Sequence, residues 1–298
     1  MTFPSRRRAI GAAAALTAGL ATAVATPALA APSAPTSAAQ AAPRGGVTPL
    51  RRAHAHNDYE HDRPLHDALA HGFTSVEADI WLVDGQLLVA HDAWQLDPAR
   101  TLEALYLDPL LARIRANGGR VYRGHDVSLQ LLIDIKNTGD ATYRELARRL
   151  RPYHSVLSKA AGGRTHARAV TAVISGDRAA RVPMAAERIR HTFYDGRLDD
   201  LLADPPAPAS FIPLISSNWN STFTWQGTGP MPAAERDTLR RVTATAHARG
   251  QRVRFWATPD QPGAAREAVW RELVAADVDH LNTDDLAGLE AFLRTADA

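Results

Sequence analysis

Residues 76–82 read VEADIWL, and residues 84–92 read DGQLLVAHD. Apolar residues surround Glu77 and Asp79, which predicts a buried β-strand over residues 73–81 that carries two carboxylates. Side chains two apart on a strand project from the same face, about 7 Å from each other. Such carboxylates repel each other unless a cation lies between them or one stays protonated. The stretch therefore predicts a buried strand whose two carboxyl groups either bind a cation or share a proton.

Similar short apolar runs recur along the chain and alternate with amphipathic segments rich in Ala, Arg and Leu. The predicted strands cover residues 50–56, 73–81, 128–136, 169–175, 191–194, 211–217, 252–257 and 278–282. The predicted helices cover residues 64–71, 101–117, 140–151, 178–188, 198–203, 232–249, 263–276 and 284–295, with Asp140 and Asp284 as N-caps. This alternation predicts a single-domain α/β protein, a (β/α)8 TIM barrel. A doubly wound open sheet is the alternative, but no Gly-rich phosphate loop follows any predicted strand.

The first 30 residues have the order of a secretory leader: arginines at 6–8, an Ala-rich apolar run, and Ala-Leu-Ala at 28–30. The paired arginines favour the twin-arginine route, so we expect a secreted, extracellular protein. A retained membrane anchor is the weaker alternative, because the apolar run is only weakly hydrophobic. Residues 31–47 are small and Pro-rich and predict a flexible linker, which leaves residues 48–298 for the barrel.

Composition excludes several kinds of site. The chain has no cysteine, so disulfides, thiolate metal sites and cysteine nucleophiles are excluded. Removing residues 1–30, which contain three arginines and no acidic residue, lowers the formal charge from +2 to −1. Nucleic-acid binding therefore lacks the basic surface that it needs. Any metal ion must be held by oxygen and imidazole ligands.

The polar residues that interrupt the apolar runs fall at one end of the predicted barrel. His56, Glu77, Asp79, Asp134, Lys136 and Trp256 lie at or near the carboxyl ends of predicted strands, and His91 closes an extra apolar segment in the second loop. In TIM barrels this is the end that carries the active site. Two carboxylates beside two histidines that exchange protons near neutral pH indicate a metal-assisted acid–base hydrolase.

These motifs resemble the PLC-like phosphodiesterases, a superfamily that includes glycerophosphodiester phosphodiesterases and sphingomyelinase D-type phospholipases. The matching residues are His-Asn at 56–57, Glu-x-Asp at 77–79, the AHD that ends at Asp92, Asp-x-Lys at 134–136, FWAT at 255–258 and VDHLNTDD at 278–285. The opening HAHNDY and the VEADIWL stretch are most similar to the branch of altered inheritance of mitochondria protein 6. The resemblance spans residues 52–286.

The resemblance implies a TIM barrel that cleaves phosphoric diesters of the glycerophosphodiester or phospholipid type with a divalent cation and two histidines. Carried over by position, it assigns metal binding to Glu77, Asp79 and Asp134, catalysis to His56 and His91, and substrate binding to Asn57, Lys136 and Trp256. Ligands that are all oxygen favour Mg²⁺ or Ca²⁺. Glycerophosphodiesterases usually have arginine where Asn57 stands, and a further Glu where Asp62-Arg63-Pro64-Leu65 stands, so the substrate does not carry over.

Two other functions remain open from the sequence. His54 and His56 resemble the opening metal pair of amidohydrolase barrels, which would bind zinc or manganese, with His191 and Asp284 as further ligands. A secreted barrel that binds phospholipid head groups or sugars without turning them over is the non-catalytic alternative. For either enzyme we expect a monomer that makes, at most, transient contact with a membrane surface. The aromatic loop at residues 216–231 is either a lid or interfacial patch that admits an acyl-bearing substrate, or a segment folded over the barrel mouth by its own aromatic residues.

Overall fold

Eight parallel strands close into a barrel in the computed structural model, which describes residues 46–296. Their order follows the chain, and the ring closes because β1 pairs in parallel with both β2 and β12. The barrel strands are β1 Leu50–Ala55, β2 Phe73–Val83, β4 Leu129–Ile135, β7 Val170–Gly176, β9 Thr192–Gly196, β10 Leu214–Asn218, β11 Arg252–Trp256 and β12 His280–Thr283. All eight predicted strands are confirmed, and the open-sheet alternative is wrong.

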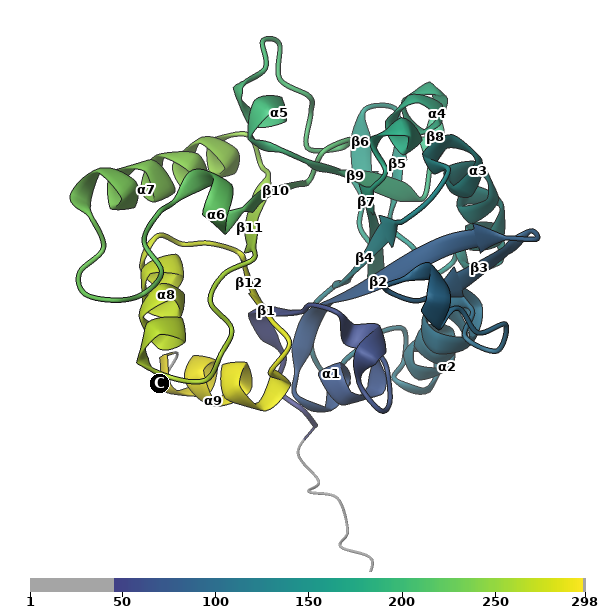
Figure 1. Cartoon of the computed structure of the whole chain (residues 1–298). Coiled ribbons are helices and arrows are strands. Elements are labelled where there is room, and N and C mark those ends of the chain that lie inside the picture. The colour runs from purple at the N-terminus through teal and green to yellow at the C-terminus, as the bar shows by residue number, and fades with distance from the viewer. Residues whose placement is uncertain (1–45, 297–298) are drawn as a thin grey trace, which may run out of the picture. The chain divides into compact units, whose positions relative to one another are not determined.

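Helices surround this ring of strands (Figure 1). They are α1 His66–Ala70, α2 Asp108–Ala116, α3 Gly139–Leu150, α4 Arg181–Ala186, α5 Leu198–Leu202, α7 Ala233–Ala248, α8 Ala264–Ala275 and α9 Leu286–Ala296. A π-helical turn, Glu103–Leu107, leads into α2. Each of these eight helices lies inside a predicted helical segment or extends at most one residue beyond it. No helix of residues 46–296 is both long and apolar enough to cross a lipid bilayer.

A small sheet of three strands and one short helix were not predicted. A small antiparallel sheet is formed by β5 Lys159–Ala161, β6 Arg164–His166 and β8 Ile189–Arg190. The short helix α6, Trp219–Thr222, begins the loop after β10. The loop's Trp219 and Phe223 are buried and pack against Phe255 of β11, with the three ring centroids 4.3 to 5.7 Å apart. The loop is therefore folded onto the barrel by its own aromatic residues, as the second of the two alternatives predicts.

Strand β2 is longer than predicted. It continues to Val83 and pairs antiparallel with β3, Gln86–Val89, through a two-residue turn at Asp84-Gly85. Both turn residues have positive φ, 48° and 74°, as the tight Asp-Gly hairpin requires. Glu77 and Asp79 therefore lie within β2 and do not end it. The hairpin returns the chain so that the backbone NH of Ala90 donates to the carbonyl of Asp79, at 3.2 Å, which places His91 beside the mouth of the barrel.

The predicted leader and almost all of the predicted linker lie outside the described residues. Export by the twin-arginine route therefore stays a prediction from the sequence. Within the described part, most buried hydrophobic side chains of the strands and the surrounding helices form one large core, and Leu132, Ala160, Val173, Phe193 and Leu214 form a second, small cluster.

Candidate active site

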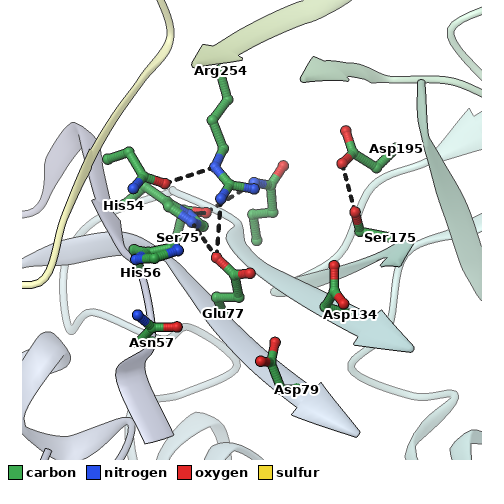
Figure 2. A network of polar contacts seen from close by, with 12 residues as sticks. His54, His56, Asn57, Ser75, Glu77, Asp79, Asp134, Ser175, Asp195 and Arg254 are labelled. Atoms are coloured by element: carbon green, nitrogen blue, oxygen red, sulfur yellow. Dashed lines mark hydrogen bonds and ion pairs between the residues drawn. The ribbon is translucent and has the colours of Figure 1, made fainter. Parts of the chain in front are cut away.

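Acidic side chains lie side by side on neighbouring strands at the mouth of the barrel. Asp79 of β2 is in register with Asp134 of β4, which is in register with Ser175 of β7. Figure 2 shows Glu77 and Asp79 on one strand and Asp134 on the next, with Ser175 and Asp195 on the wall beyond them. The parallel register brings together residues that are about 55 and 41 positions apart in the chain.

Glu77 is buried and lies between two partners (Figure 2). Arg254 donates to Glu77 Oε2 at 3.0 Å, and His54 Nε2 lies 3.3 Å from the same oxygen. Burial alone would raise the pKa of Glu77, but the Arg254 charge and the His54 hydrogen bond hold it well below its usual range. Glu77 is thus a carboxylate at every pH at which the protein would work.

Lys136 bridges the other two carboxylates. Its ammonium lies 2.8 Å from Asp79 Oδ2 and 3.1 Å from Asp134 Oδ1. Burial would lower the pKa of Lys136, yet these two carboxylates raise it above its ordinary value. Burial and the negative charge of Glu77 raise the pKa of Asp79. The mouth therefore holds a permanent cation inside a crowded set of acids.

His91 and Tyr59 meet at Asp79. His91 Nδ1 lies 3.2 Å from Asp79 Oδ2, and the Tyr59 hydroxyl donates to the same oxygen at 2.6 Å. The hydroxyl also lies 3.0 Å from His91 Nδ1 and 2.8 Å from the side-chain oxygen of Asn57. About half of the His91 side chain is exposed. Tyr59 thus connects Asn57, in the loop after β1, to His91, in the loop after β3.

His56 follows β1 and is held by Asp284. His56 Nδ1 lies 2.7 Å from Asp284 Oδ1, which also accepts from the Asn57 amide at 3.4 Å. Burial would lower the pKa of His56, but the hydrogen bond to Asp284 and the charge of Glu77 outweigh it and raise the pKa. Asp284 is therefore not the N-cap that the sequence predicted. Asp285 has that role, because its carboxylate accepts from the Gly288 NH at 2.9 Å.

The prediction of Asp140 as an N-cap is also wrong. The residue lies inside the first turn of α3, whose N-cap is Thr138, and its carboxylate pairs with Arg144 at 2.7 Å. Trp256 ends β11 as predicted and is 36% exposed, but none of the polar contacts described above involves it. Its role in substrate binding stays a prediction.

A chain of hydrogen bonds, in which each side chain donates to the next, runs inside the barrel beneath the mouth. Arg252 donates to Gln130 at 2.7 Å, and Gln130 donates to the Ser75 hydroxyl at 2.8 Å. The hydroxyl lies 2.7 Å from Nδ1 of His54, whose Nε2 faces Glu77. Burial lowers the pKa of His54 to about 3, so the ring is neutral and carries its proton on Nε2. His54 therefore orients Glu77 and does not exchange protons with a substrate.

This arrangement does not assemble the amidohydrolase set. His54 is fully buried and is bound to Ser75 and Glu77. His191 directly precedes β9, at the amino end of the barrel, whereas Asp284 follows β12 at the carboxyl end. Residues at opposite ends of the strands cannot bind one ion.

The chemistry of Glu77, Asp79 and Asp134 fits the divalent cation that the family resemblance implies. All their donor atoms are carboxylate oxygens, and Asp79 Oδ1 is buried with no hydrogen-bond partner among residues 46–296. Against these three negative charges stand the two cations Arg254 and Lys136. In this part of the chain no three His, Cys, Asp or Glu side chains converge as they stand to hold an ion. The fit is thus one of donor type and charge, and the cation stays a prediction.

Asp58 supports the first loop from beneath. It is fully buried, and its Oδ2 accepts from the Leu65 NH at 2.6 Å and from the Tyr106 hydroxyl at 2.9 Å. Leu65 has a positive φ of 64°, so this bond holds a strained backbone. Burial raises the pKa of Asp58 to about 7. Its second carboxylate oxygen, Oδ1, has no hydrogen-bond partner among residues 46–296.

Asp58→Asn is expected to flatten the pH dependence of stability. A carboxyl whose folded pKa lies above the unfolded value of 3.8 stabilises fully below that value, and the contribution is lost as pH rises through about 7. Between pH 5 and 8 we expect the wild type to lose about 1–3 kcal/mol relative to the variant. Urea denaturation at both pH values measures this. Parallel pH dependence of the two proteins would show that Asp58 is ionised throughout.

Comparisons with known proteins agree with this geometry. A family model for an AIM6-like phosphodiesterase domain matches residues 44–195, and one for the glycerophosphoryl diester phosphodiesterase family matches residues 252–287. The chain is 32% identical to altered inheritance of mitochondria protein 6 of Eremothecium gossypii over 280 residues, which cover 83% of this chain and 70% of that protein. It is 28% identical to the homolog of Arthroderma benhamiae over 274 residues, 83% of this chain and 85% of that one.

A solved structure shares the fold. A glycerophosphoryl diester phosphodiesterase from Parabacteroides distasonis superposes with a TM-score of 0.50 at 14% identity, over 84% of this chain and 87% of that one. Together with the family matches, this confirms the resemblance to the PLC-like phosphodiesterases.

Proposed function

Since the chain belongs to the AIM6-like phosphodiesterase domain family, we propose that it hydrolyses phosphoric diesters with two histidines as acid and base and a divalent cation as cofactor. One observation carries the proposal: each histidine at the mouth has its Nδ1 held by an aspartate, His56 by Asp284 and His91 by Asp79. An imidazole held in this way keeps one orientation and leaves Nε2 to exchange a proton.

The two histidines divide the proton transfers between them. One takes the proton of the nucleophile, and the other gives a proton to the leaving alkoxide. The nucleophile is water or a neighbouring hydroxyl of the substrate, and the second case releases a cyclic phosphate. Lys136, which Asp79 and Asp134 keep protonated, binds a non-bridging phosphate oxygen.

Glu77, Asp79 and Asp134 are the residues that would hold Mg²⁺ or Ca²⁺, and such an ion offsets the negative charge of the phosphate in the transition state. Arg254 and His54 fix the Glu77 carboxylate. Because both partners are buried and Glu77 stays ionised, this carboxylate is pre-organised for a cation and needs no deprotonation.

A cavity of about 640 Å³ beside His91 favours a polar group on the substrate. Its lining includes Tyr59, Glu60, His61, Asp62, Gln95 and Arg100. Charged and hydrogen-bonding side chains of this kind suit a hydroxylated head group better than an acyl chain. We therefore expect the head group, and not the hydrocarbon, to decide which diesters are cleaved.

The test is hydrolysis of a chromogenic phosphodiester, of glycerophosphodiesters and of lysophospholipids, followed by ³¹P NMR with Mg²⁺, with Ca²⁺ and with EDTA. We expect turnover with Mg²⁺ or Ca²⁺ that EDTA abolishes and that re-addition of the ion restores. The phosphorus shift distinguishes a cyclic from an open product. Binding of these diesters without turnover under any ion would contradict the proposal in favour of a head-group-binding barrel.

A further inference from the structure

A second polar cavity lies at the opposite end of the barrel from the mouth. It has a volume of about 590 Å³, and its lining includes Arg51, Arg52, Arg252, Asp277, Asp279 and His280. Arg252 and His280 are the first residues of β11 and β12, so the cavity is at the amino ends of the strands. Neither the proposed function nor the family comparison assigns a role to this end.

Most charges around this cavity are paired. Arg52 donates to Asp277 at 2.5 Å. Asp279 Oδ2 lies 2.8 Å from His247 Nε2 and accepts from the Val253 NH at 2.8 Å. Asp277 and Asp279 are thus both hydrogen-bonded to groups other than Arg252.

Arg252 differs, because both of its hydrogen-bond partners are neutral. It donates to the Gln130 side-chain oxygen at 2.7 Å and to His280 Nε2 at 3.0 Å. Within residues 46–296 no carboxylate lies within the 4.0 Å of an ion pair with Arg252, although Asp279 is close enough to act on its charge. A guanidinium drawn into the barrel without a bound counterion is costly.

His280 adds an unused donor beside this cation. Its Nε2 accepts from Arg252, so the ring proton is on Nδ1, which is buried and has no partner among the described residues. Burial and the Arg252 charge lower the pKa of His280 well below its ordinary value, so the ring is neutral. The partly exposed Ser128, whose hydroxyl lies 3.1 Å from that of Thr171, and the exposed Arg51 are on the same lining.

We propose that this cavity binds a small oxyanion, the phosphate group of inorganic phosphate or of a phosphomonoester, on Arg252. A guanidinium offers several donors in a planar fork, which matches a phosphate better than a halide. The anion supplies the missing counterion, and the three arginines of the lining exceed its two aspartates by one charge. The volume exceeds that of phosphate alone and leaves room for a small organic group.

Calorimetric titration of inorganic phosphate into the full-length protein, at fixed ionic strength and with EDTA present, tests the proposal. A Lys136→Met variant serves as the background, because it weakens phosphate binding at the mouth and leaves the other end intact. In this background we expect Arg252→Gln to weaken phosphate binding at least about tenfold. Unchanged affinity in Arg252→Gln, or no phosphate binding in the Lys136→Met background, would overturn the proposal.

A second variant acts in the opposite direction and guards against misfolding. Asp277→Asn removes one acid of the lining and frees Arg52, so phosphate should bind about three- to tenfold more tightly. Asp277 has a positive φ of 61°, a conformation that Asn adopts readily. Weaker or unchanged binding in this variant would contradict an anion site here. Anomalous diffraction from crystals soaked in selenate locates the anion, which we expect at the Arg252 guanidinium.

Discussion

Replacing His56 by alanine is expected to lower kcat of diester hydrolysis at least about 100-fold. His56 is one of the two imidazoles at the mouth, and its Nδ1 contact with Asp284 at 2.7 Å leaves Nε2 to exchange the proton. Without the ring, water must carry out one of the two proton transfers. His91→Ala is expected to have an effect of the same order, because His91 serves the other transfer. Steady-state kinetics with Mg²⁺ measures both.

Asp284→Asn separates orientation from proton transfer. The ring stays but loses its negatively charged partner, so we expect a smaller decrease, about 10- to 100-fold. The limb of the pH–rate profile that belongs to His56 should move to lower pH, because the hydrogen bond to Asp284 is the largest of the contributions that raise the pKa of His56 against the effect of burial. A merely structural role of Asp284 would reduce activity without moving that limb.

His166→Ala is the matched control. His166 is an exposed histidine on β6, in the small sheet outside the barrel, and its loss should leave kcat unchanged. Full activity of His56→Ala beside a normal His166→Ala would contradict the two-histidine mechanism. Loss of activity in the control alone would point to a fault in folding.

Much of the barrel follows from the sequence because its strands are short apolar runs separated by amphipathic helices. Buried parallel strands read in this way since both faces are covered. The sheet of β5, β6 and β8 was missed for the opposite reason. Its strands are two or three residues long, and β6, Arg-Thr-His, is fully exposed, so no apolar pattern marks it.

The acids of the candidate site were predicted from local spacing, but their partners were not. Glu77 and Asp79 are two residues apart on one strand, which a sequence shows directly. Arg254 lies 177 residues from Glu77, and Asp284 lies 228 residues from His56, so only the closure of the barrel brings them together. The one available signal for Arg254 was a charge in the apolar run Val253 to Trp256, read only as a strand.

Arg254→Met is expected to destabilise the fold by about 3–5 kcal/mol. Arg254 is 3% exposed and donates to Glu77 at 3.0 Å and to Asn282 at 2.9 Å. Methionine has a similar length, so packing is largely kept, but the buried Glu77 carboxylate loses its counterion. Guanidinium chloride denaturation in EDTA measures the loss without a divalent ion that would take the place of the arginine.

A second substitution shows whether the cost comes from the charge that is left behind. In Glu77→Gln/Arg254→Met both charges are gone, so the double variant should be more stable than Arg254→Met alone, although it carries one more substitution. Addition of Mg²⁺ to Arg254→Met should restore part of the stability if Glu77 belongs to a cation site, and should leave the double variant unaffected. If the double variant instead lost the sum of what Arg254→Met and Glu77→Gln lose singly, Glu77 and Arg254 would not depend on each other. The pair would then be a poor basis for the pre-organised carboxylate on which the proposed mechanism relies.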